Sequence, residues 1–556
     1  MSSLADDLRK IIAGDVADDD KTKELYSHDA SLFELVPDVV VSPKDSNDVC
    51  KLVEFVKKNK AKYPNLSLTA RGAGTDMSGG AINTSIIVDF KKYFTKIETI
   101  DAKNKFSRLQ PGVMYKDFDE KAKKKGVLMP TYPASRDLCT VGGMVNNNAG
   151  GEKSIEFGKV ENFVNKLEFV FADGVKREVR PLTKAELNKK IKQKDFEGKV
   201  YKQLYELIEA NYDRIKKAKP NVSKDSTGYH LWRVWDREAG IFDLTQVITG
   251  AQGTLGFVTD IEFRLTDARS EEWLLVVFMK DTKNLGELIK KVVAKKPSRF
   301  ESFDDNTLLL SIKFMPKFYK LLGLKKFIRL LISLIPDGLL LLKGVPRLIL
   351  MISIKGNSPE EVELKIKELH NELKADAKKF SISGFEEAPR ERQGEKFWIM
   401  RRYSFQILRS SVKDKHTAPF IDDFIVPPEH LPEFLPKLRK IISKYKLFAT
   451  VAGHMGDGNF HIIPLMNIEL KTERAKIMPA MKEVNDLVLS YGGSLSGEHN
   501  DGMIRGPLLE SMYGKEMFNI LKKVKHIFDP DNIFNPHKKT DASWSFSEKN
   551  IRKNFD

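Results

Sequence analysis

Cysteine is scarce in this chain. Only Cys50 and Cys139 occur among 556 residues, and two thiols cannot ligate an iron–sulfur cluster or build a disulfide framework. Scarce cysteine is typical of proteins from a reducing compartment. Residues 1–7 also lack a basic segment followed by an apolar run, which is the mark of a secretory signal. We therefore expect a cytoplasmic protein without an iron–sulfur cluster.

Two further patterns are absent. The formal net charge is +16, but the lysines are spread along the chain and form no basic block interleaved with aromatic residues, so no nucleic-acid partner is expected. A basic surface of this kind is most simply a solvated surface, and it could also favour binding to an anionic membrane or to an acidic substrate. The glycine-rich stretch 71–80 lacks the G-x-G-x-x-G spacing before a long helix, which excludes a Rossmann dinucleotide site.

The length and the first hundred residues indicate a multidomain α+β protein. A chain of 556 residues exceeds what one hydrophobic core usually supports, so two or three domains are expected. Residues 1–36 have the pattern of a helical lead-in, and strands are predicted at 39–41, 66–70 and 86–89. The second strand runs into the glycine-rich stretch 71–80, whose backbone N–H groups can hold a pyrophosphate.

A second stretch rich in small residues lies between residues 110 and 151. It contains Gln110-Pro-Gly-Val113 and the run Thr140 to Gly151. Glycine, alanine and asparagine at this density suit close packing of the backbone against a large flat ligand. A loop-rich surface is the alternative, but apolar residues are interleaved throughout. We interpret the stretch as part of a cofactor site.

Two histidines flank a predicted tight turn. Asp457-Gly458 favours a two-residue turn with positive φ at both central positions, which would place His454 opposite His461. Opposed side chains have Cβ atoms about 4.5–5.5 Å apart, so both rings could bind one divalent ion. Glu498, beside His499 in a glycine-flanked loop, offers a third ligand. The alternative is a pair of histidines packed on the turn.

Together these segments resemble a flavoprotein family. They are similar to the FAD-binding domain of the vanillyl-alcohol oxidase and p-cresol methylhydroxylase (PCMH) type, in particular its D-lactate, glycolate and D-2-hydroxyglutarate dehydrogenase branch. The motifs occur in family order and cover most of the chain. Besides the two glycine-rich stretches, the motifs are residues 168–174, 225–229, 248–259, 453–461, 497–499 and 528–536.

The resemblance implies the domain order. We expect an α+β fold in which a PCMH-type FAD-binding domain of two subdomains is joined to an α+β cap, or substrate, domain with an antiparallel sheet. The implied boundaries are a lead-in at 1–36, the FAD-binding domain at 37–268, the cap domain at 269–495, an active-site loop and C-terminal return to the FAD domain at 496–540, and a tail at 541–556.

The resemblance also implies a set of FAD contacts, with the pyrophosphate on the first glycine-rich loop. Relatives that attach the flavin covalently often use a histidine in this loop, and none occurs between Arg71 and Gly80, so we expect non-covalent FAD. The implied contacts are Arg71, Gly72, Ala73, Gly74, Thr75, Asp76, Ser78, Gly79, Pro111, Gly112, Ser135, Thr140, Gly142, Gly143, Asn146, Asn147, Gly253, Thr254, Gly256, Val258 and Asn535.

The histidine segments suggest how a 2-hydroxy acid would be oxidised. A divalent ion on His454, His461 and Glu498 could bind the hydroxyl and a carboxylate oxygen, which lowers the hydroxyl pKa. Zinc suits these ligands, with manganese or iron(II) as alternatives. His499 is the predicted general base, since neighbours in an extended segment point to opposite sides, and flavin N5 would accept the hydride. The family resemblance supports the same roles.

Arg401 and Asn459 are the predicted substrate contacts. A guanidinium binds a carboxylate bidentately, and Arg401 falls on the matching position of the family's tryptophan-then-arginine motif. Arg402 is the competitor, and a surface arginine pair is the alternative. Asn459, in the hairpin turn, could hydrogen-bond the same acid. Relatives that oxidise D-2-hydroxyglutarate have a lysine near the position of Ile421 that binds the distal carboxylate of the substrate. This chain has no lysine there, which puts binding of that carboxylate in doubt.

The stretch 314–343 departs from the family pattern. It is apolar and basic without an acidic residue until Asp337, and it is too interrupted to span a bilayer, which needs about 20 mainly apolar residues. One interpretation is an interfacial anchor whose lysines reach anionic headgroups, which would place the protein peripherally on the inner face of a membrane. The other is a buried helical pair of the cap domain.

The sequence therefore predicts an FAD-dependent dehydrogenase that converts D-lactate or a similar D-2-hydroxy acid, with D-2-hydroxyglutarate as a candidate, to the 2-oxo acid. Because no cluster-binding motif follows Pro536, we expect electrons to pass to a quinone or a separate electron-transfer protein, and dioxygen stays open. A homodimer is compatible with the sequence. The alternatives are an alkyldihydroxyacetonephosphate synthase-like flavoenzyme, which shares the FAD fold, and a non-catalytic FAD-binding protein.

Overall fold

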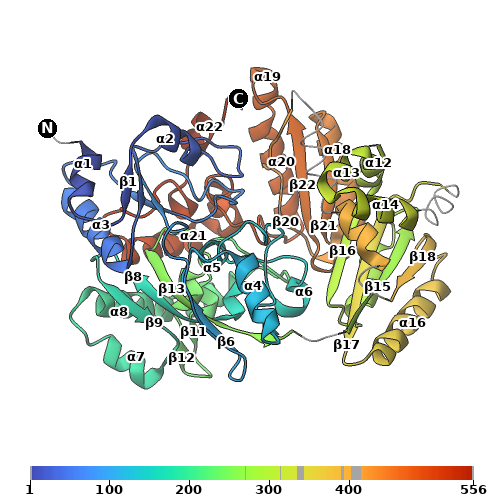
Figure 1. Ribbon diagram of the computed structural model, residues 1–556, viewed down its shortest axis with the longest axis horizontal. Coiled ribbons are helices and arrows are strands. Elements are labelled where there is room, and N and C mark those ends of the chain that lie inside the picture. The colour runs from blue at the N-terminus through green and yellow to red at the C-terminus, as the bar shows by residue number, and fades with distance from the viewer. Residues whose placement is uncertain are drawn as a thin grey trace.

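The protein consists of two lobes that lie side by side (Figure 1). The N-terminal lobe is drawn in blue to green, the cap lobe in yellow to orange, and the red C-terminal segment returns to the first lobe. The described residues contain no helix with the length and apolarity needed to cross a membrane. The computed structural model describes residues 3–268, 271–313, 315–334, 344–389, 393–401 and 415–553.

The N-terminal lobe is built on two main sheets, as expected for two subdomains. The first has the order β1-β2-β4-β3 and the second the order β5-β6-β13-β8-β9. The strands of the first sheet are β1 (Asp15–Ala17), β2 (Val39–Ser42), β3 (Leu68–Arg71) and β4 (Ile86–Asp89). Those of the second are β5 (Ile97–Asp101), β6 (Phe106–Leu109), β8 (Val164–Val170), β9 (Lys176–Val179) and β13 (Phe257–Arg264).

The lead-in 1–36 is not purely helical, so this part of the prediction was wrong. Strand β1 lies between α1 (Leu4–Arg9) and α2 (Asp20–Tyr26) and pairs antiparallel with β2. Three residues, none of them fully buried, give a weak sequence pattern, and the pairing with β2 decides their conformation.

Helices and short strands complete the N-terminal lobe. The long amphipathic helices bury one apolar face against the two sheets. The helices are α3 (Ser46–Asn59), α4 (Tyr115–Lys124), α5 (Val141–Asn147), α6 (Ser154–Phe157), η1 (Val160–Asn162), α7 (Lys184–Lys190), α8 (Phe196–Ala210), α9 (Tyr212–Lys217), η2 (Leu231–Arg233) and α10 (Thr245–Ile248). The short strands are β7 (Val127–Leu128), β10 (Leu182–Thr183), β11 (Trp235–Asp236), β12 (Ile241–Phe242) and β14 (Thr266–Asp267).

The C-terminal segment packs on the N-terminal lobe, as predicted for 496–540. Residue 68 of β3 donates its backbone N–H to the carbonyl of Ile533 at 2.8 Å, and Asn535 donates to the carbonyl of Leu68 at 2.9 Å. Phe528 stacks on Phe171 in the core of the lobe. The elements of this segment are η5 (Gly506–Leu508), α21 (Leu509–Phe528), η6 (Lys539–Asp541) and α22 (Trp544–Lys549).

The cap lobe is organised around one antiparallel sheet, which confirms the predicted architecture. Its order is β18-β15-β17-β16-β21-β22-β19, and β20 also pairs with β22. All of these pairings are antiparallel. The strands are β15 (Glu271–Met279), β16 (Arg299–Asp304), β17 (Leu348–Gly356), β18 (Ile382–Ala388), β19 (His416–Thr417), β20 (Phe424–Ile425), β21 (Phe448–His454) and β22 (Asn459–Met466).

Both faces of the cap sheet are covered because its strands are apolar on both sides. Leu275 and Val277 face one apolar cluster, whereas Leu274 and Val276 face another, as expected when side chains alternate along a strand. The helices of this lobe are α11 (Leu285–Val293), α12 (Asp305–Lys313), α13 (Met315–Leu322), α14 (Leu324–Ser333), α16 (Pro359–Ala375), residues 393–401, η3 (Pro428–His430), α18 (Leu431–Lys444), η4 (Met455–Asp457), α19 (Lys471–Arg474) and α20 (Ile477–Ser490).

The β21–β22 hairpin exists, but its predicted register was wrong. Residues 455–458 form the connection, in which η4 is followed by Gly458 with φ +69°. His454 therefore pairs with Asn459, and His461 pairs with Ala452. A longer loop shifts the pairing by two residues, which keeps each side chain on its face. The two histidines are thus diagonal neighbours, with ring centroids 5.2 Å apart.

Candidate active site

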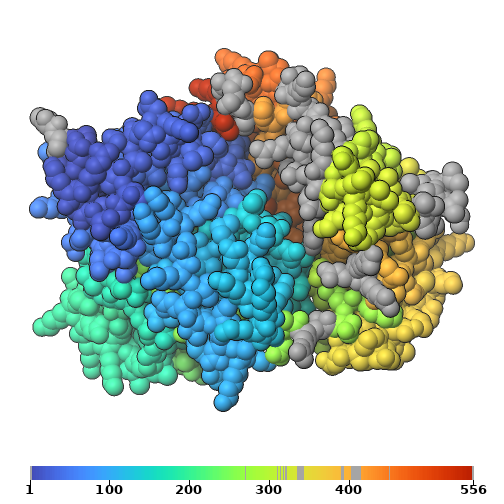
Figure 2. Space-filling view, in the orientation of Figure 1, coloured from blue at the N-terminus to red at the C-terminus, as the bar shows by residue number. Residues whose placement is uncertain are grey.

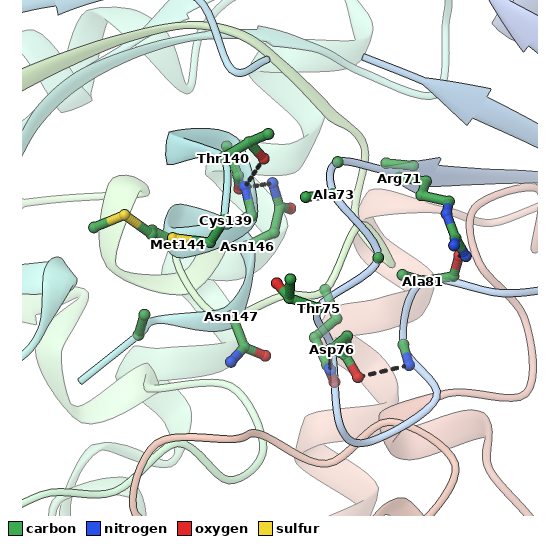
Figure 3. A pocket seen from close by; sticks show the side chains of 18 of the residues that line it. Arg71, Ala73, Thr75, Asp76, Ala81, Cys139, Thr140, Met144, Asn146 and Asn147 are labelled. Carbon is green, nitrogen blue, oxygen red and sulfur yellow. Dashed lines mark hydrogen bonds between the residues drawn. The ribbon is translucent and has the colours of Figure 1, made fainter. Parts of the chain in front are cut away.

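A cavity of about 260 Å³ opens between the glycine-rich loops of the N-terminal lobe. The loop after β3 forms one wall and the start of α5 the opposite wall (Figure 3). Thr140 caps α5 by accepting a hydrogen bond from the N–H of Gly143. The predicted FAD contacts that line this cavity are Arg71, Gly72, Ala73, Gly74, Thr75, Asp76, Pro111, Ser135, Thr140, Gly142, Gly143, Asn146, Asn147, Gly253 and Val258.

Six predicted FAD contacts do not line the cavity. They lie behind its walls, where they hold the loops in place. Asn535 donates its side-chain N–H to the carbonyls of Gly80 and Gln252, and the hydroxyl of Ser78 donates to the carboxylate of Asp76. The six residues are Ser78, Gly79, Gly112, Thr254, Gly256 and Asn535. Cavity residues that the sequence did not single out include Met77, Phe90, Cys139, Met144, Gln252 and Phe257.

The walls of this cavity fit a large flat cofactor. A Cβ atom on Gly72 would lie 2.3 Å from Oγ1 of Thr140, so only glycine lets the two walls approach this closely. Oδ1 of Asn147 is buried without a hydrogen-bond partner among the described residues, which leaves an acceptor for an N–H group of a ligand. Both features suit FAD.

The second half of the site is a cluster of histidines and carboxylates. Three imidazole Nε2 atoms converge on Oε1 of Glu498: His454 at 3.1 Å, His461 at 3.2 Å and His499 at 3.8 Å. Ligand atoms of Asp423, His461, Glu498 and His499 all lie within 4.8 Å of one another. Imidazole nitrogens and carboxylate oxygens at this spacing form a donor set typical of zinc and of other divalent transition metals.

Each histidine is oriented by a second carboxylate. Nδ1 of His454 lies 2.6 Å from Oε1 of Glu301. Asp422 holds two rings, with Oδ1 3.0 Å from Nδ1 of His461 and Oδ2 2.6 Å from Nδ1 of His499. A carboxylate at Nδ1 keeps the proton there and leaves the Nε2 lone pair for a metal or a substrate proton. The arrangement therefore fits a metal, with His454, His461 and Glu498 as the ligands that would hold it.

The charges of the cluster shift the pKa values of its members strongly. Burial disfavours the charged ring of His461, but Asp422 and Glu498 outweigh burial and raise its pKa to about 10. Burial likewise opposes ionisation of Glu498, yet Lys224 and His454 hold its pKa well below the usual range. A metal bound by the His461 ring would therefore have to displace a proton from it.

His499 connects the cluster to the cavity. The predicted orientation was wrong: the ring does not point away from Glu498 but lies in the cluster, 5.0 Å from the ring of His461. Its backbone N–H donates to Asp423 at 2.6 Å, and this turn of the chain brings neighbouring side chains to one side. Among His454, His461 and His499, only His499 also lines the cavity.

Asp423 fixes the loop that carries Glu498 and His499. It is completely buried and has a φ of +69°, which is unusual for a residue other than glycine and typical of functional sites. Its carboxylate accepts hydrogen bonds from the backbone N–H groups of Glu498 and His499 and from Oγ of Ser496.

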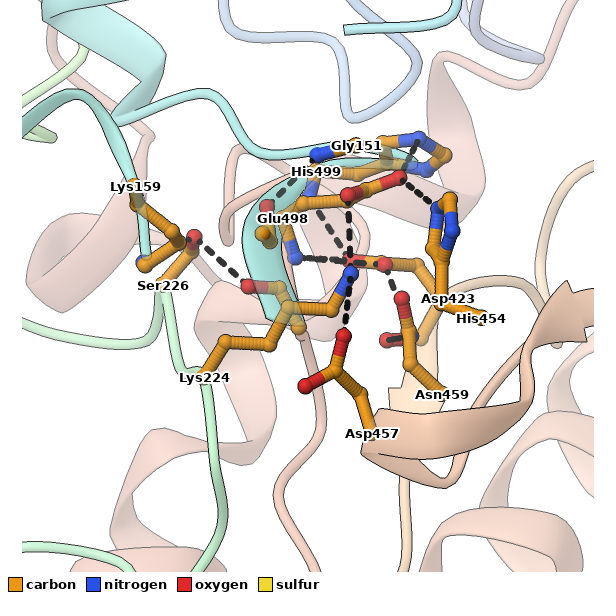
Figure 4. A network of polar contacts seen from close by, with 12 residues as sticks. Gly151, Lys159, Lys224, Ser226, Asp423, His454, Asp457, Asn459, Glu498 and His499 are labelled. Carbon is orange, nitrogen blue, oxygen red and sulfur yellow. Dashed lines mark hydrogen bonds and ion pairs between the residues drawn. The ribbon is translucent and has the colours of Figure 1, made fainter. Parts of the chain in front are cut away.

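Lys224 of the N-terminal lobe enters the cluster from the other side (Figure 4). Its side chain is 1% exposed, and its Nζ lies 3.0 Å from Oε2 of Glu498 and 3.8 Å from Oδ2 of Asp457. Since Oε2 of Glu498 is bound to Lys224, Oε1 is the oxygen that faces the histidines. The ligand set thus depends on residues of both lobes.

The two predicted substrate contacts differ in their surroundings. Nη2 of Arg401 forms an ion pair with Oε2 of Glu301, and its buried Nε has no hydrogen-bond partner among the described residues, so a donor is left for a carboxylate. Asn459 instead donates Nδ2 to the carbonyl of Phe424 and to Asp423. Neither Arg401 nor Asn459 lines the cavity. Arg402 lies outside the described residues.

Sequence reasoning missed four groups that complete the cluster. Asp422 and Asp423 carried a signal, because two adjacent acids interrupt an otherwise apolar strand and precede Pro427. Glu301 and Lys224 carried none, since each is one of many charged residues and only the packing of β16 and of the 224–229 loop brings them to the histidines.

Comparison with known proteins agrees with this architecture. Residues 37–180 match a family described as "FAD binding domain", and residues 269–539 match "FAD linked oxidases, C-terminal domain". The chain therefore combines an FAD-binding domain with the C-terminal domain of FAD-linked oxidases. It is 26% identical over 528 residues to the D-2-hydroxyglutarate dehydrogenase of Pseudomonas putida, in an alignment that covers 94% of the chain and 50% of the relative. The chain therefore spans about half the length of that relative.

Other similar proteins are matched over nearly their whole length. Glycolate oxidase subunit GlcD of Bacillus subtilis is 24% identical, with 92% of the chain and 91% of the relative covered. The solved structure of p-cresol methylhydroxylase with substrate bound has a TM-score of 0.65 at 13% identity and covers 97% of the chain and 96% of that structure. The latter similarity confirms the predicted PCMH-type fold.

Proposed function

We propose that this protein oxidises a small D-2-hydroxy acid, such as D-lactate, to the 2-oxo acid. The observation that carries the proposal is the position of His499, which lies both in the histidine–carboxylate cluster and in the wall of the cofactor cavity. Relatives named for D-2-hydroxyglutarate and D-lactate dehydrogenation support the substrate class. D-2-hydroxyglutarate is a second candidate substrate.

The residues have distinct roles in this reaction. FAD, when bound, supplies the hydride acceptor, and a divalent metal supplies a Lewis acid that lowers the pKa of the substrate hydroxyl. His499 receives the hydroxyl proton at Nε2, because Asp422 occupies Nδ1. Of the three imidazoles, that of His499 is the most distant from Oε1 of Glu498, at 3.8 Å. We therefore assign it the role of base rather than that of ligand.

Arg401 would bind the substrate carboxylate. Its ion pair with Glu301 fixes the guanidinium beside the residue that also orients His454, and its free Nε–H remains a donor. Zinc is our proposed metal, with manganese or iron(II) as alternatives, and FAD is proposed to be non-covalent. Electrons would leave to a quinone or a separate electron-transfer protein.

The alternatives lack a specific use for the cluster. An alkyldihydroxyacetonephosphate synthase-like enzyme would share the fold, and a non-catalytic protein would share the cavity. Neither class explains three histidines that converge on one carboxylate and are each oriented by another.

Anaerobic flavin bleaching tests the proposal. The flavin-loaded protein is mixed with a panel of D- and L-2-hydroxy acids, before and after treatment with a chelator. We expect bleaching by a D acid, lost after chelation and restored by metal. Bleaching by no 2-hydroxy acid at any metal loading would rule out the proposed function.

A further inference from the structure

The cap lobe carries an unusually basic and apolar segment. Between Thr307 and Val345 the sequence contains seven lysine or arginine residues and one acidic residue, Asp337. The structure describes α12, α13 and α14 in this segment, whereas Phe314 and residues 335–343 lie outside the described residues. The three helices stand at the surface of the cap lobe, in yellow-green (Figure 2).

Exposed apolar side chains are concentrated on this segment. Among the described residues, half of the large hydrophobic side chains that are markedly exposed fall between residues 309 and 345. On α14 these are Leu324, Ile328, Leu331 and Ile332, with exposed fractions of 60%, 46%, 41% and 62%. The spacing i, i+4, i+7, i+8 places all four on one stripe of the helix. A stripe of this kind is rare on a monomeric soluble surface.

The opposite face of α14 is already used in packing. Leu330, Phe318 of α13 and Ile399 are buried against one another, and Nζ of Lys396 donates to the carbonyl of Ser333 at 3.1 Å. Because these contacts fix α14 on the helix 393–401, the exposed stripe is not the face that packs in the cap lobe. The stripe therefore faces away from the cap lobe and could bind a partner without any unfolding of α14.

Positive charge borders the stripe on one side. Lys325, Lys326 and Arg329 are exposed. At 100° per residue Lys325 and Arg329 follow Ile332 around the helix, whereas Lys326 lies farther round, toward Leu330. We propose that α14, with α13 beside it, docks in the plane of an anionic lipid bilayer. The apolar stripe would enter the acyl boundary, and Lys325 and Arg329 at its border would meet lipid phosphates.

The charge pattern favours a lipid surface over the other occupants of such a stripe. A second copy of this chain would bring the same cations against these cations, and like charges at an interface are unfavourable. An anionic bilayer instead offers a continuous negative surface to a segment with seven basic residues and one acidic residue. The proposal is independent of the reaction proposed above.

Vesicle flotation tests the proposal with the flavin-loaded protein. Vesicles of phosphatidylcholine with 30% phosphatidylglycerol are compared with pure phosphatidylcholine at low and high salt. We expect binding to the anionic vesicles only, and weaker binding as salt rises. The double variant Lys325→Glu/Arg329→Glu should bind at least about 25-fold more weakly, since each basic residue contributes about fivefold near such a surface.

Matched variants separate this site from general effects. Ile328→Ser/Ile332→Ser removes half of the stripe and should weaken binding about tenfold or more, whereas Leu364→Ser/Leu470→Ser removes two equally exposed side chains elsewhere and should not. Lys192→Glu/Lys194→Glu, in an exposed loop of the other lobe, controls for net charge. All variants should keep their flavin and their activity with a water-soluble acceptor.

Three outcomes would overturn the proposal. The first is no binding to anionic vesicles at low salt. The second is equal loss of binding in the stripe variants and their controls. The third is a concentration-dependent dimer, measured by sedimentation velocity, that the Ile328→Ser/Ile332→Ser variant abolishes while vesicle binding persists, because the stripe would then be an interface between two copies.

Discussion

The cofactor cavity and the histidine–carboxylate cluster meet at His499 but are built by opposite means. More than a third of the residues that line the cavity are glycine or alanine, so the cavity would select a ligand largely by shape and by backbone N–H groups. The cluster consists of buried charges, each compensated by another, such as Lys224 with Glu498 and Asp422 with His461. Loss of one buried charge leaves its partner unpaired, whereas a substitution at a wall position with room for it, such as Gly253, leaves no charge unpaired. The two regions should therefore respond differently to substitution.

The largest effect is expected where the two regions meet. His499→Ala removes the proposed base but no assigned metal ligand, so flavin and metal should remain while the rate of flavin reduction falls by about 10²–10⁴. Stopped-flow absorbance measures the rate. His430→Ala, on the exposed η3, is the control and should behave as the wild type. A decrease below tenfold in His499→Ala would show that another group accepts the proton.

The next effect separates the cluster from the cavity. Asp422→Asn removes the charge at Nδ1 of both His461 and His499, and loss of such an outer partner weakens metal binding by about 10–100-fold. Competition with a chromophoric chelator measures the affinity, and flavin content should not change. Asp486→Asn, on the surface, is the control. Unchanged metal affinity would mean that Asp422 does not orient the ligands.

A smaller effect tests the contribution of the N-terminal lobe. Lys224→Met removes the ion pair with Oε2 of Glu498 and should weaken metal binding by about tenfold, the lower range for a hydrogen bond to a charged group. Lys159→Met is the matched control, because that buried lysine binds Ser226 and not Glu498. If both variants lose metal equally, the loss reflects general destabilisation and the positioning role of Lys224 is wrong.

The smallest effect concerns the cavity alone. Gly253 has a φ of +68°, and a Cβ there would meet Ala70 at 3.5 Å, an ordinary contact. Gly253→Ala therefore adds backbone strain of about 1 kcal/mol and should weaken flavin binding about fivefold without changing metal affinity. Gly126→Ala, at φ +80° with nothing within 4 Å, carries the same strain outside the cavity. Fluorescence titration of the flavin-free protein should show a loss in the first variant only.

The sequence was most informative where chemistry is encoded locally. Glycine-rich loops after a strand predicted the cavity because backbone conformation and small side chains are properties of short segments. The histidines that flank the Asp457-Gly458 turn predicted the cluster for the same reason, because the turn is also a property of a short segment. Two features could not be predicted from the sequence. The hairpin register depends on a four-residue connection, and the side on which His499 lies depends on the left-handed backbone conformation of Asp423.

Long-range partners were invisible for a different reason. Lys224 and Glu498 are separated by 274 residues, and their contact depends on how the two lobes pack. The strand β1 depends in the same way on its pairing with β2. Sequence patterns therefore identified most of the cavity wall and the histidines of the cluster, whereas the residues that orient these histidines required the fold.

Metal titration tests the central claim most directly. Flavin-loaded protein is stripped of metal, mixed anaerobically with the D-2-hydroxy acid that bleaches it best, and titrated with Zn²⁺ or Mn²⁺. We predict that the flavin is reduced only as metal is added, that the amplitude saturates at one metal per flavin, and that the L enantiomer is inactive. Full-rate reduction without metal, or equal reduction by both enantiomers, would contradict the account.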